Sequence, residues 1–266
     1  MFLVFDIGGT KTRLAVSDDK QTLRAEPLII PTPLEWGDAK EKIENAIAQL
    51  GDRYEGVCGG LPGILDEGKE TLLWSPNLPD WVGKPIQHFF ADVTGAPVSL
   101  CHDTALAGIA EARRGAGEGH RIVAYITVST GVGGTRLVDG KPDVARYQAE
   151  PGDQIIDPQS GLTLEGLVSG SAFAEKYGPD FVTTTPSAAW QEAGRILALG
   201  LHNTIIHWSP DIMVLGGSMI TKPIGISLEV VSEHLSRLMK AFPDIPVLAK
   251  SKFADRAGLV GALLSL

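Results

Sequence analysis

The residues best suited to chemistry lie near the N-terminus, where a carboxylate ends an apolar run and two glycines follow it. Asp6 closes the run Phe2–Phe5, and Gly8 and Gly9 lie just beyond. Polar and apolar residues alternate from Arg13, so a second strand follows and the glycines form a hairpin turn. Because glycine has no Cβ, backbone N–H groups in such a turn approach phosphate oxygens closely. The segment predicts a phosphate and metal site that is neither a Walker loop nor a dinucleotide fingerprint, since both of those lead into a helix.

Two further glycine turns follow buried strands. The segment 129–135 joins the strand expected at 122–128 to the one at 136–138, and a strand at 212–215 stops at a glycine pair. Each half of the chain thus presents strand, glycine turn, strand, which is an internal repeat of architecture. Together the turns suit a nucleoside triphosphate with Mg²⁺. The predicted nucleotide contacts are Gly8, Gly9, Thr10, Lys11, Thr12, Thr130, Gly131, Gly133, Gly216 and Gly217.

Length and composition bound the class of protein. A chain of 266 residues with 44% hydrophobic and 21% charged residues is typical of a folded α/β enzyme of two moderate domains. A formal net charge of -9 argues against a nucleic-acid surface. Cys58 and Cys101 lie in no CxxC pair, which excludes a disulfide framework. No signal peptide or membrane span is recognisable, so we expect a cytoplasmic protein without a membrane partner.

The periodicity of apolar residues predicts the elements that must position these turns. Helices are expected at 35–50, 85–95, 103–114, 187–208, 225–239 and 255–264, and further strands at 56–61, 98–100 and 246–248. The strand at 98–100 delivers Asp103 at its end. Earlier in the chain, a rigid loop rich in glycine and proline at Gly63 follows the strand at 56–61, and a second such loop lies at Asn77. Loops of this kind often hold ligands.

In chain order, the motifs resemble those of ROK-family sugar kinases over nearly the whole sequence. They are Asp6-Ile7-Gly8-Gly9-Thr10-Lys11-Thr12, Leu61-Pro62-Gly63, Pro76-Asn77-Leu78, His102-Asp103-Thr104-Ala105, Thr130-Gly131-Val132-Gly133-Gly134, Gly216-Gly217 and Ala257-Gly258-Leu259-Val260-Gly261-Ala262. The resemblance implies an actin-like ATPase (ribonuclease H-like) fold with two α/β domains around a central cleft. We expect a smaller domain at 1–103, completed by 252–266, and a larger one at 104–251. Dimers are also implied by the family.

The resemblance also implies roles for individual residues. Members phosphorylate hexoses or N-acetylhexosamines with ATP, and Asp103 matches the aspartate that takes the proton from the sugar hydroxyl. From the residues alone, Asp103 could equally be the N-cap of the helix that follows it. Asp6 looks like the residue that holds Mg²⁺ through water. The positions that match sugar-binding residues are Gly63, Asn77, His102, Asp103, Glu150 and Glu165.

The sugar side departs from the family's pattern in two places. Asp153 stands where the family has a zinc-ligating His, and the segment 157–165 lacks the cysteines of its zinc motif, so we expect no structural zinc. His102 stands where an Asn usually precedes the catalytic Asp, and a neutral imidazole offers its donor and acceptor with a different reach. The choice of sugar therefore stays open.

Two other functions remain possible from the sequence. One is a non-catalytic sugar or nucleotide sensor of the same fold, which the altered zinc motif and His102 suggest. The other is an actin-like kinase that acts on a non-sugar acceptor, which Glu150 and Asn77 disfavour. The leading hypothesis is an ATP-dependent sugar kinase that closes on its substrates.

Overall fold

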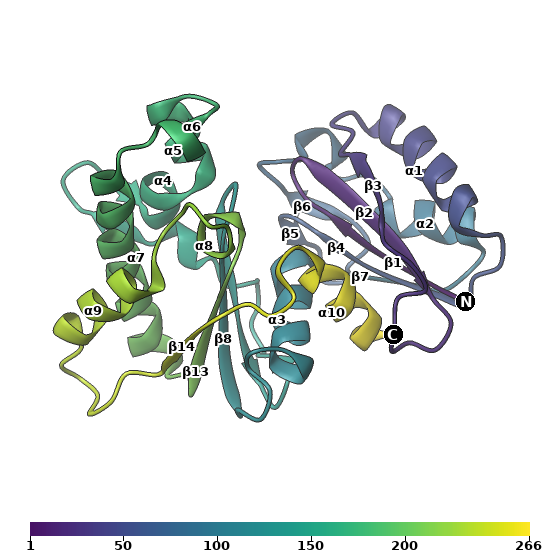
Figure 1. Cartoon of the computed structure of the whole chain (residues 1–266). Coiled ribbons are helices and arrows are strands. Elements are labelled where there is room, and N and C mark those ends of the chain that lie inside the picture. The colour runs from purple at the N-terminus through teal and green to yellow at the C-terminus, as the bar shows by residue number, and fades with distance from the viewer. The chain divides into compact units, whose positions relative to one another are not determined.

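The computed structural model describes residues 1–266 and divides into two compact units. Unit 1 comprises Met1–Ala110 and Arg256–Leu266, and unit 2 comprises Glu111–Asp255. Each unit has its own sheet (Figure 1). Both sheets have five strands, and each unit has its own hydrophobic core. The domain boundaries expected from the sequence stay a proposal.

The sheet of unit 1 brings three strand ends to one edge. Its order is β3 (Leu28–Pro31), β2 (Lys11–Ser17), β1 (Phe2–Ile7), β4 (Gly56–Leu61) and β7 (Val98–His102). The first three strands are antiparallel neighbours, whereas β1, β4 and β7 run parallel. Asp6 pairs with Gly60, and Leu61 pairs with His102. The ends of β1 and β7, where Asp6 and Asp103 lie, therefore share the carboxyl edge of the sheet.

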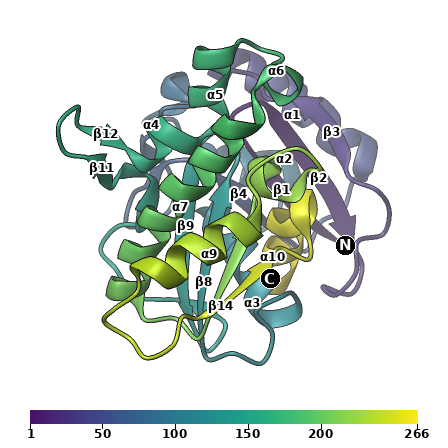
Figure 2. The same ribbon diagram turned by 60° about the vertical axis from the view of Figure 1, so that its left-hand side comes forward.

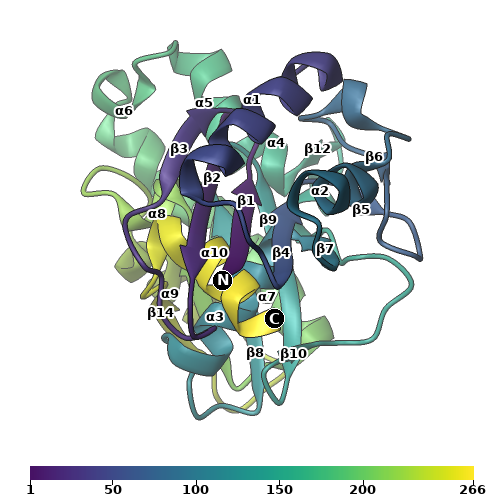
Figure 3. The same ribbon diagram turned by 90° about the vertical axis from the view of Figure 1, so that its right-hand side faces the viewer.

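Helices cover both faces of this sheet. Residues of α1 (Trp36–Leu50) and α2 (Ile86–Thr94) share one core with Phe5 and Ile7 of β1. Asp6 points to the opposite face, because neighbouring side chains alternate along a strand, and α10 (Ala257–Ser265) packs there. The chain therefore returns to unit 1 at its end, and the two termini lie close together (Figure 3).

Close contacts in this core depend on small residues. The rings of Phe5 and Phe90 stack with centroids 4.0 Å apart, and a Cβ on Gly59 would lie 2.2 Å from the Phe5 ring. The remaining elements of unit 1 are the hairpin of β5 (Ile64–Leu65) and β6 (Leu72–Trp74) and the short helix η1 (Pro79–Trp81). Trp81 of η1 is fully buried, and its indole N–H donates to the Pro33 carbonyl.

The sheet of unit 2 repeats the pattern of unit 1. Its order is β10 (Lys141–Pro142), β9 (Val132–Val138), β8 (Ile122–Val128), β13 (Ile212–Gly216) and β14 (Val247–Lys250). Again the first three strands are antiparallel neighbours and the last three run parallel. The predicted repeat of strand, glycine turn and strand is confirmed.

Two long helices share the core of the second sheet. The helices α7 (Ser187–Trp208) and α9 (Leu228–Leu238) pack against each other (Figure 2). Leu197 and Leu201 of α7 share the core with Leu235 of α9. The smaller elements are η2 (Pro151–Asp153), β11 (Ile155–Asp157), β12 (Leu162–Thr163), α4 (Leu164–Val168), α5 (Gly170–Tyr177), α6 (Phe181–Thr184), α8 (Ser218–Thr221) and η3 (Ala254–Arg256).

The long elements agree with the sequence prediction. The predicted bounds of α3 (Asp103–Arg114), β8 and α7 are those of the structure. The helix expected from Gly225 begins instead at Leu228, because the Ser227 hydroxyl caps it by accepting from the Val230 amide. The β11–β12 hairpin and the helices α4 to α6 were not predicted, since their short runs carry little periodicity.

Two helical glycines of unit 1 give a direct test of this packing. A Cβ on Gly261 of α10 would lie 1.7 Å from the Leu106 carbonyl oxygen, whereas a Cβ on Gly37 of α1 would meet nothing within 4 Å. We expect Gly261→Ala to destabilise the fold by about 1–3 kcal/mol through overpacking. Gly37→Ala should stabilise it by about 0.5 kcal/mol, since alanine favours the helix. Urea unfolding measures both, and equal effects would contradict the packing of α10.

Candidate functional site

In unit 1, Thr32, which directly follows the edge strand β3, stabilises the first glycine turn. The Gly8 amide donates to the Lys11 carbonyl at 2.9 Å, which closes the turn. The Thr32 hydroxyl donates to the Gly8 carbonyl at 2.7 Å, and the Thr32 amide donates to the Thr10 carbonyl at 3.1 Å. The buried Thr12 hydroxyl lies 3.1 Å from that of Thr32. The side chain of Thr12 thus supports the turn, and a nucleotide contact of Thr12 stays a prediction.

Asp6 lies beside this turn, close to the guanidinium group of Arg13 and to the start of α10. Its Oδ2 is 3.8 Å from Nη1 of Arg13, the residue paired with it on β2. A Cβ on Gly258, near the start of α10, would lie 2.6 Å from the Asp6 Cγ. The helix start therefore reaches the carboxylate only because residue 258 is glycine.

The end of β7 places His102 and Asp103 together. Asp103 is the first residue of α3, and its Oδ1 accepts from the Thr104 amide at 2.6 Å. The His102 Nδ1 lies 2.5 Å from the Thr104 hydroxyl and 3.3 Å from the Asp103 Oδ1. A Cβ on Gly60 would come within 3.0 Å of the Asp103 Cα, so β4 closes over the base of this site.

Burial shifts the pKa values of Asp103 and His102. Although 28% of the Asp103 side-chain surface is exposed, loss of water raises the pKa of its carboxyl to about 7, against the opposing effect of the Thr104 amide. Burial lowers the pKa of His102 to about 4, so its imidazole is neutral near pH 7. The pair therefore combines a carboxyl that titrates near neutrality with an uncharged ring.

The two loops predicted to bind sugar are tied to each other and to the glycine turn. The Ser75 hydroxyl donates to the Pro62 carbonyl at 2.7 Å, which links the Gly63 loop to the Asn77 loop. Gly63 has φ +116°, and a Cβ there would lie 2.3 Å from the Trp74 carbonyl oxygen. A Cβ on Gly9 would lie 3.0 Å from the Asn77 Cγ. Asn77 thus borders the first glycine turn.

In unit 2, the turn after β8 is surrounded by other glycines. The Gly170 amide, at the start of α5, donates to the Ser129 carbonyl at 2.7 Å. A Cβ on Gly217 would lie 2.2 Å from the Val128 carbonyl oxygen, and the hydroxyls of Ser129 and Ser218 are 3.2 Å apart. The two glycine segments predicted to contact nucleotide in this unit, 130–133 and 216–217, are therefore adjacent.

Glu165 packs against the same turn. Its Oε2 accepts from the Val132 amide at 2.7 Å, and a Cβ on Gly131 would lie 2.5 Å from that oxygen. This contact orders the turn, so Glu165 has a structural task besides its predicted sugar contact. Glu150 precedes η2, where a Cβ on Gly152 would meet the Val132 carbonyl oxygen at 2.1 Å.

The segment 157–165, which the sequence resemblance matches to the family's zinc motif, contains the turn of the β11–β12 hairpin. In it, Asp157 accepts from the Gln159 amide and from the Ser160 hydroxyl, and these bonds lower the pKa of its carboxyl. The chain holds no group of three or more His, Cys, Asp or Glu side chains that could bind a metal. Side-chain hydrogen bonds close the turn of this hairpin.

The predicted site residues thus fall into two sets, one in each unit. Asp6, the first glycine turn, Gly63, Asn77, His102 and Asp103 belong to unit 1, whereas the other glycine turns, Glu150 and Glu165 belong to unit 2. Sequence reasoning missed Thr32, Ser129, Ser218 and Gly170, which support the turns. The Pro31-Thr32-Pro33 tripeptide was the one visible signal for Thr32, as a turn that ends a strand.

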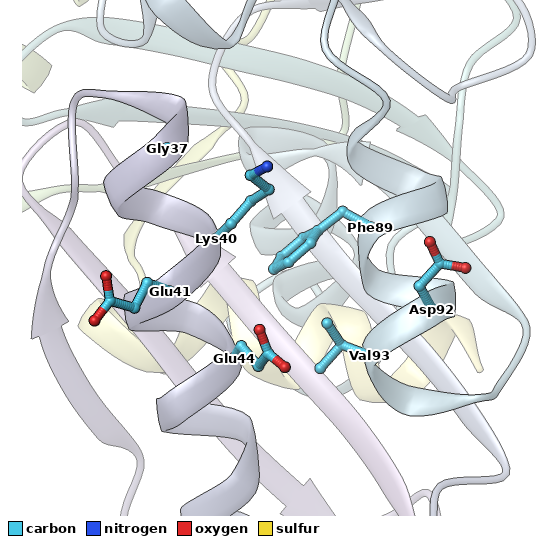
Figure 4. Close-up of a pocket in the computed structure, with 7 residues that line it drawn as sticks. All are labelled: Gly37, Lys40, Glu41, Glu44, Phe89, Asp92 and Val93. Atoms are coloured by element: carbon cyan, nitrogen blue, oxygen red, sulfur yellow. The ribbon is translucent and has the colours of Figure 1, made fainter.

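A groove of about 490 Å³ lies within unit 1, between α1 and α2. Phe89 and Val93 form its apolar side, and charged residues flank it (Figure 4). Its lining residues are Gly37, Lys40, Glu41, Glu44, Phe89, Asp92 and Val93. None of the predicted site residues is among them. Along the whole chain, no helix combines the length and apolar character that a membrane crossing needs.

Comparison with known proteins decides the family. Residues 3–265 match the ROK family. The chain belongs to the ROK family. It is 30% identical over 281 residues to a fructokinase of Zymomonas mobilis, with 96% of this chain and 92% of the other covered. It is 26% identical over 300 residues to an N-acetyl-D-glucosamine kinase of Escherichia coli, with 98% of each chain covered.

A solved structure agrees with these relatives. The inorganic polyphosphate/ATP-glucomannokinase of an Arthrobacter strain superimposes with a TM-score of 0.75 at 26% identity, covering 99% of this chain and 97% of the other. The expected fold is confirmed, since the ROK chain has the repeated mixed sheets of the actin-like ATPase fold. The assignments of individual site residues stay predictions.

The raised pKa of Asp103 predicts how the stability of this ROK protein varies with pH. The folded state binds the proton more tightly than the unfolded state, so stability falls as pH rises from about 4 to about 7. Asp103→Asn removes this penalty. Near pH 8 the variant should exceed the wild type by on the order of 1–2 kcal/mol, discounted for partial exposure, and near pH 4 the two should agree. Thermal unfolding at both pH values measures the difference, and a variant less stable near pH 8 would contradict the burial of Asp103.

Proposed function

We propose that this ROK-family sugar kinase transfers the γ-phosphate of ATP to a hydroxyl of a hexose or N-acetylhexosamine, with Asp103 as the base. The observation that carries the proposal is the desolvated carboxyl of Asp103 at the carboxyl edge of the sheet, beside His102. Its surroundings hold the pKa near 7, where a base is both ionised in a large fraction and able to bind the proton.

The neighbours of Asp103 fix its orientation. The Thr104 amide holds Oδ1. This leaves Oδ2 as the oxygen that would accept the sugar proton as the hydroxyl attacks phosphorus. His102 is uncharged, so it adds no cation that would lower the pKa of the carboxyl and weaken the base. Phosphoryl transfer asks a side chain for little more than this positioning of the nucleophile.

In this proposal, the glycine turns bind the phosphates of ATP. In each unit, glycines after a strand leave room for phosphate oxygens close to backbone N–H groups, which Thr32 and the start of α5 hold in place. Asp6 fits Mg²⁺, because that ion takes one or two carboxylates together with waters and phosphate oxygens rather than a cage of protein ligands. A bound Mg²⁺ would offset the charge of the phosphates.

In this proposal, residues of two loops, His102 and two glutamates contact the sugar. Gly63, Asn77 and His102 lie on linked loops and strand ends of unit 1, and Glu150 and Glu165 lie near the glycine turn of unit 2. The related proteins act on fructose, N-acetylglucosamine and, as the name glucomannokinase indicates, glucose and mannose. These sugars define the panel to test. A cytoplasmic location and a homodimer belong to the proposal as well.

Replacement of Asp103 by Asn tests the chemical role. Asn keeps the shape of the side chain but cannot accept the proton, so sugar-dependent ADP release should fall by about 10²-fold or more while nucleotide binding persists. ADP release is measured over fructose, glucose, mannose and N-acetylglucosamine, with and without EDTA. Asp92→Asn, on the exposed face of α2, is the matched control and should keep wild-type activity.

Each outcome of this assay has a defined meaning. A fully active Asp103→Asn variant would rule out the role of the base. If no sugar of the panel gave ADP release while calorimetry detected sugar binding, the protein would be a sensor. ADP release that persists unchanged in EDTA would contradict the requirement for Mg²⁺.

His102 should control the choice of sugar. Its ring occupies the place of an amide in the family's pattern and lies between Thr104 and Asp103. We expect His102→Asn to change the KM for the preferred sugar by about tenfold and the KM for ATP by less than about threefold, because the nucleotide turns are untouched. Steady-state kinetics on both substrates measures this, and equal shifts in the two constants would exclude a role in sugar recognition.

A further inference from the structure

An arginine lies opposite the proposed metal residue in the first glycine hairpin. Arg13 of β2 pairs with Asp6 of β1, so the two side chains lie on the same face of the sheet. The Nη1 of Arg13 is 3.8 Å from the Asp6 Oδ2. Only 18% of the Arg13 side chain and 16% of the Asp6 side chain are exposed. Charges with so little water around them need partners, and each of these two has the other.

The start of α10 adds a second positive field at Asp6. A Cβ on Gly258 would lie 2.8 Å from the Asp6 Oδ2 and 2.9 Å from its Oδ1, so the first turn of the helix lies against the carboxylate. The N-terminal amides of a helix carry partial positive charge. The N-cap Arg256 is bound elsewhere, since its Nη2 donates to both carboxylate oxygens of Glu26, at 2.6 and 2.7 Å. Arg13 and the helix start therefore balance the charge of Asp6 before any metal ion binds.

This arrangement is unfavourable for a metal ion that arrives alone. A divalent cation at Asp6 gains the attraction of one carboxylate, but it meets the repulsion of a guanidinium within ion-pair distance of that carboxylate. Mg²⁺ also prefers sites where the phosphates of a substrate supply further oxygens. The ion therefore gains most when it arrives already bound to a nucleotide.

Arg13 also lies beside the turn that binds phosphates in the proposed function. The hydrogen bond from the Gly8 amide to the Lys11 carbonyl closes this turn, two residues before Arg13. A guanidinium carries five N–H donors in a planar fork, so it can bind a carboxylate and a phosphate at once. Phosphate oxygens held between the turn amides and a metal ion at Asp6 would neighbour this cation.

From these contacts we propose that Arg13 is a phosphate-binding residue, whose guanidinium balances Asp6 in the empty site and donates to phosphate oxygens once nucleotide and Mg²⁺ enter together. This inference rests on the proposed kinase function, because it adds a residue to the nucleotide site of that reaction. A purely structural role, in which Arg13 only neutralises a buried carboxylate, predicts different binding constants.

Arg13→Gln is the direct test, because it removes the charge and keeps a polar side chain. Without nucleotide, the Kd for Mn²⁺, measured from the EPR signal of the free ion, should fall by about tenfold, since the cation that competes for Asp6 is lost. Without metal, in EDTA, the Kd for fluorescent N-methylanthraniloyl-ADP should rise by about tenfold, since the phosphates lose a charged donor. The two constants should thus move in opposite directions.

Four further variants separate this role from other effects. Arg13→Met keeps the aliphatic stem and should reproduce both shifts, which keeps the test valid where Arg13→Gln folds poorly. Arg13→Lys keeps the charge and should change both constants by less than about threefold. Arg53→Gln removes an exposed arginine elsewhere in unit 1 and should behave as wild type, which controls for net charge. Asp6→Asn combined with Arg13→Gln should abolish the gain in Mn²⁺ affinity, because the ion then lacks its carboxylate.

Three outcomes would overturn the proposal. If both constants rose in Arg13→Gln together with a lower midpoint of thermal unfolding, Arg13 would only support the fold. An unchanged Kd for the nucleotide would exclude a contact with phosphate, and an unchanged Kd for Mn²⁺ would exclude competition at Asp6. If the wild-type chain released no ADP with any sugar, the proposed function would fail, and these two binding constants would still decide the role of Arg13.

Discussion

The loss of water around the Asp103 carboxyl is the interaction on which the proposed chemistry depends. A carboxyl in water has a pKa near 4 and is a weak base. Here β4 approaches the Asp103 backbone through Gly60, and the pKa of the carboxyl rises to about 7. The same burial keeps His102 neutral, so no positive charge offsets the effect. The fold thus makes an ordinary aspartate into a group that titrates at neutrality, and its stability is reduced by that ionisation.

Close backbone contacts provide the geometry around this group. Gly60, Gly258 and Gly261 in unit 1, and Gly217 in unit 2, each lie where a Cβ would meet another chain segment. In unit 1 these glycines let strands and helices approach so closely that Asp6, Asp103 and the first glycine turn share one edge of the sheet. Thr32 and Glu165 then hold the turns by hydrogen bonds to the backbone. Rigid support of this kind is what phosphate recognition by backbone N–H groups requires.

The sequence predicted the long elements and the turns but not what supports them. The periodicity of α3 and α7 and the β-branched run of β8 were strong local signals, and their bounds agree with the structure. Thr32 acts on Gly8 across 24 residues through the pairing of β2 with β3, so its role depended on register. Glu111 lay in an alanine-rich helix where a glutamate usually faces solvent, and only the fold shows that it is buried. Residue roles on the sugar side rested on resemblance, since neither spacing nor periodicity encodes them.

The central claim is that a desolvated Asp103 is the base of a sugar kinase, and the pH dependence of kcat/KM for the preferred sugar tests it most directly. This profile reports the ionisation of groups in the free enzyme. The account predicts that kcat/KM increases about tenfold per pH unit below the pKa and levels off above about pH 7, because the reactive form of Asp103 is ionised. A profile that is flat from about pH 5.5 to about pH 8.5 would contradict it.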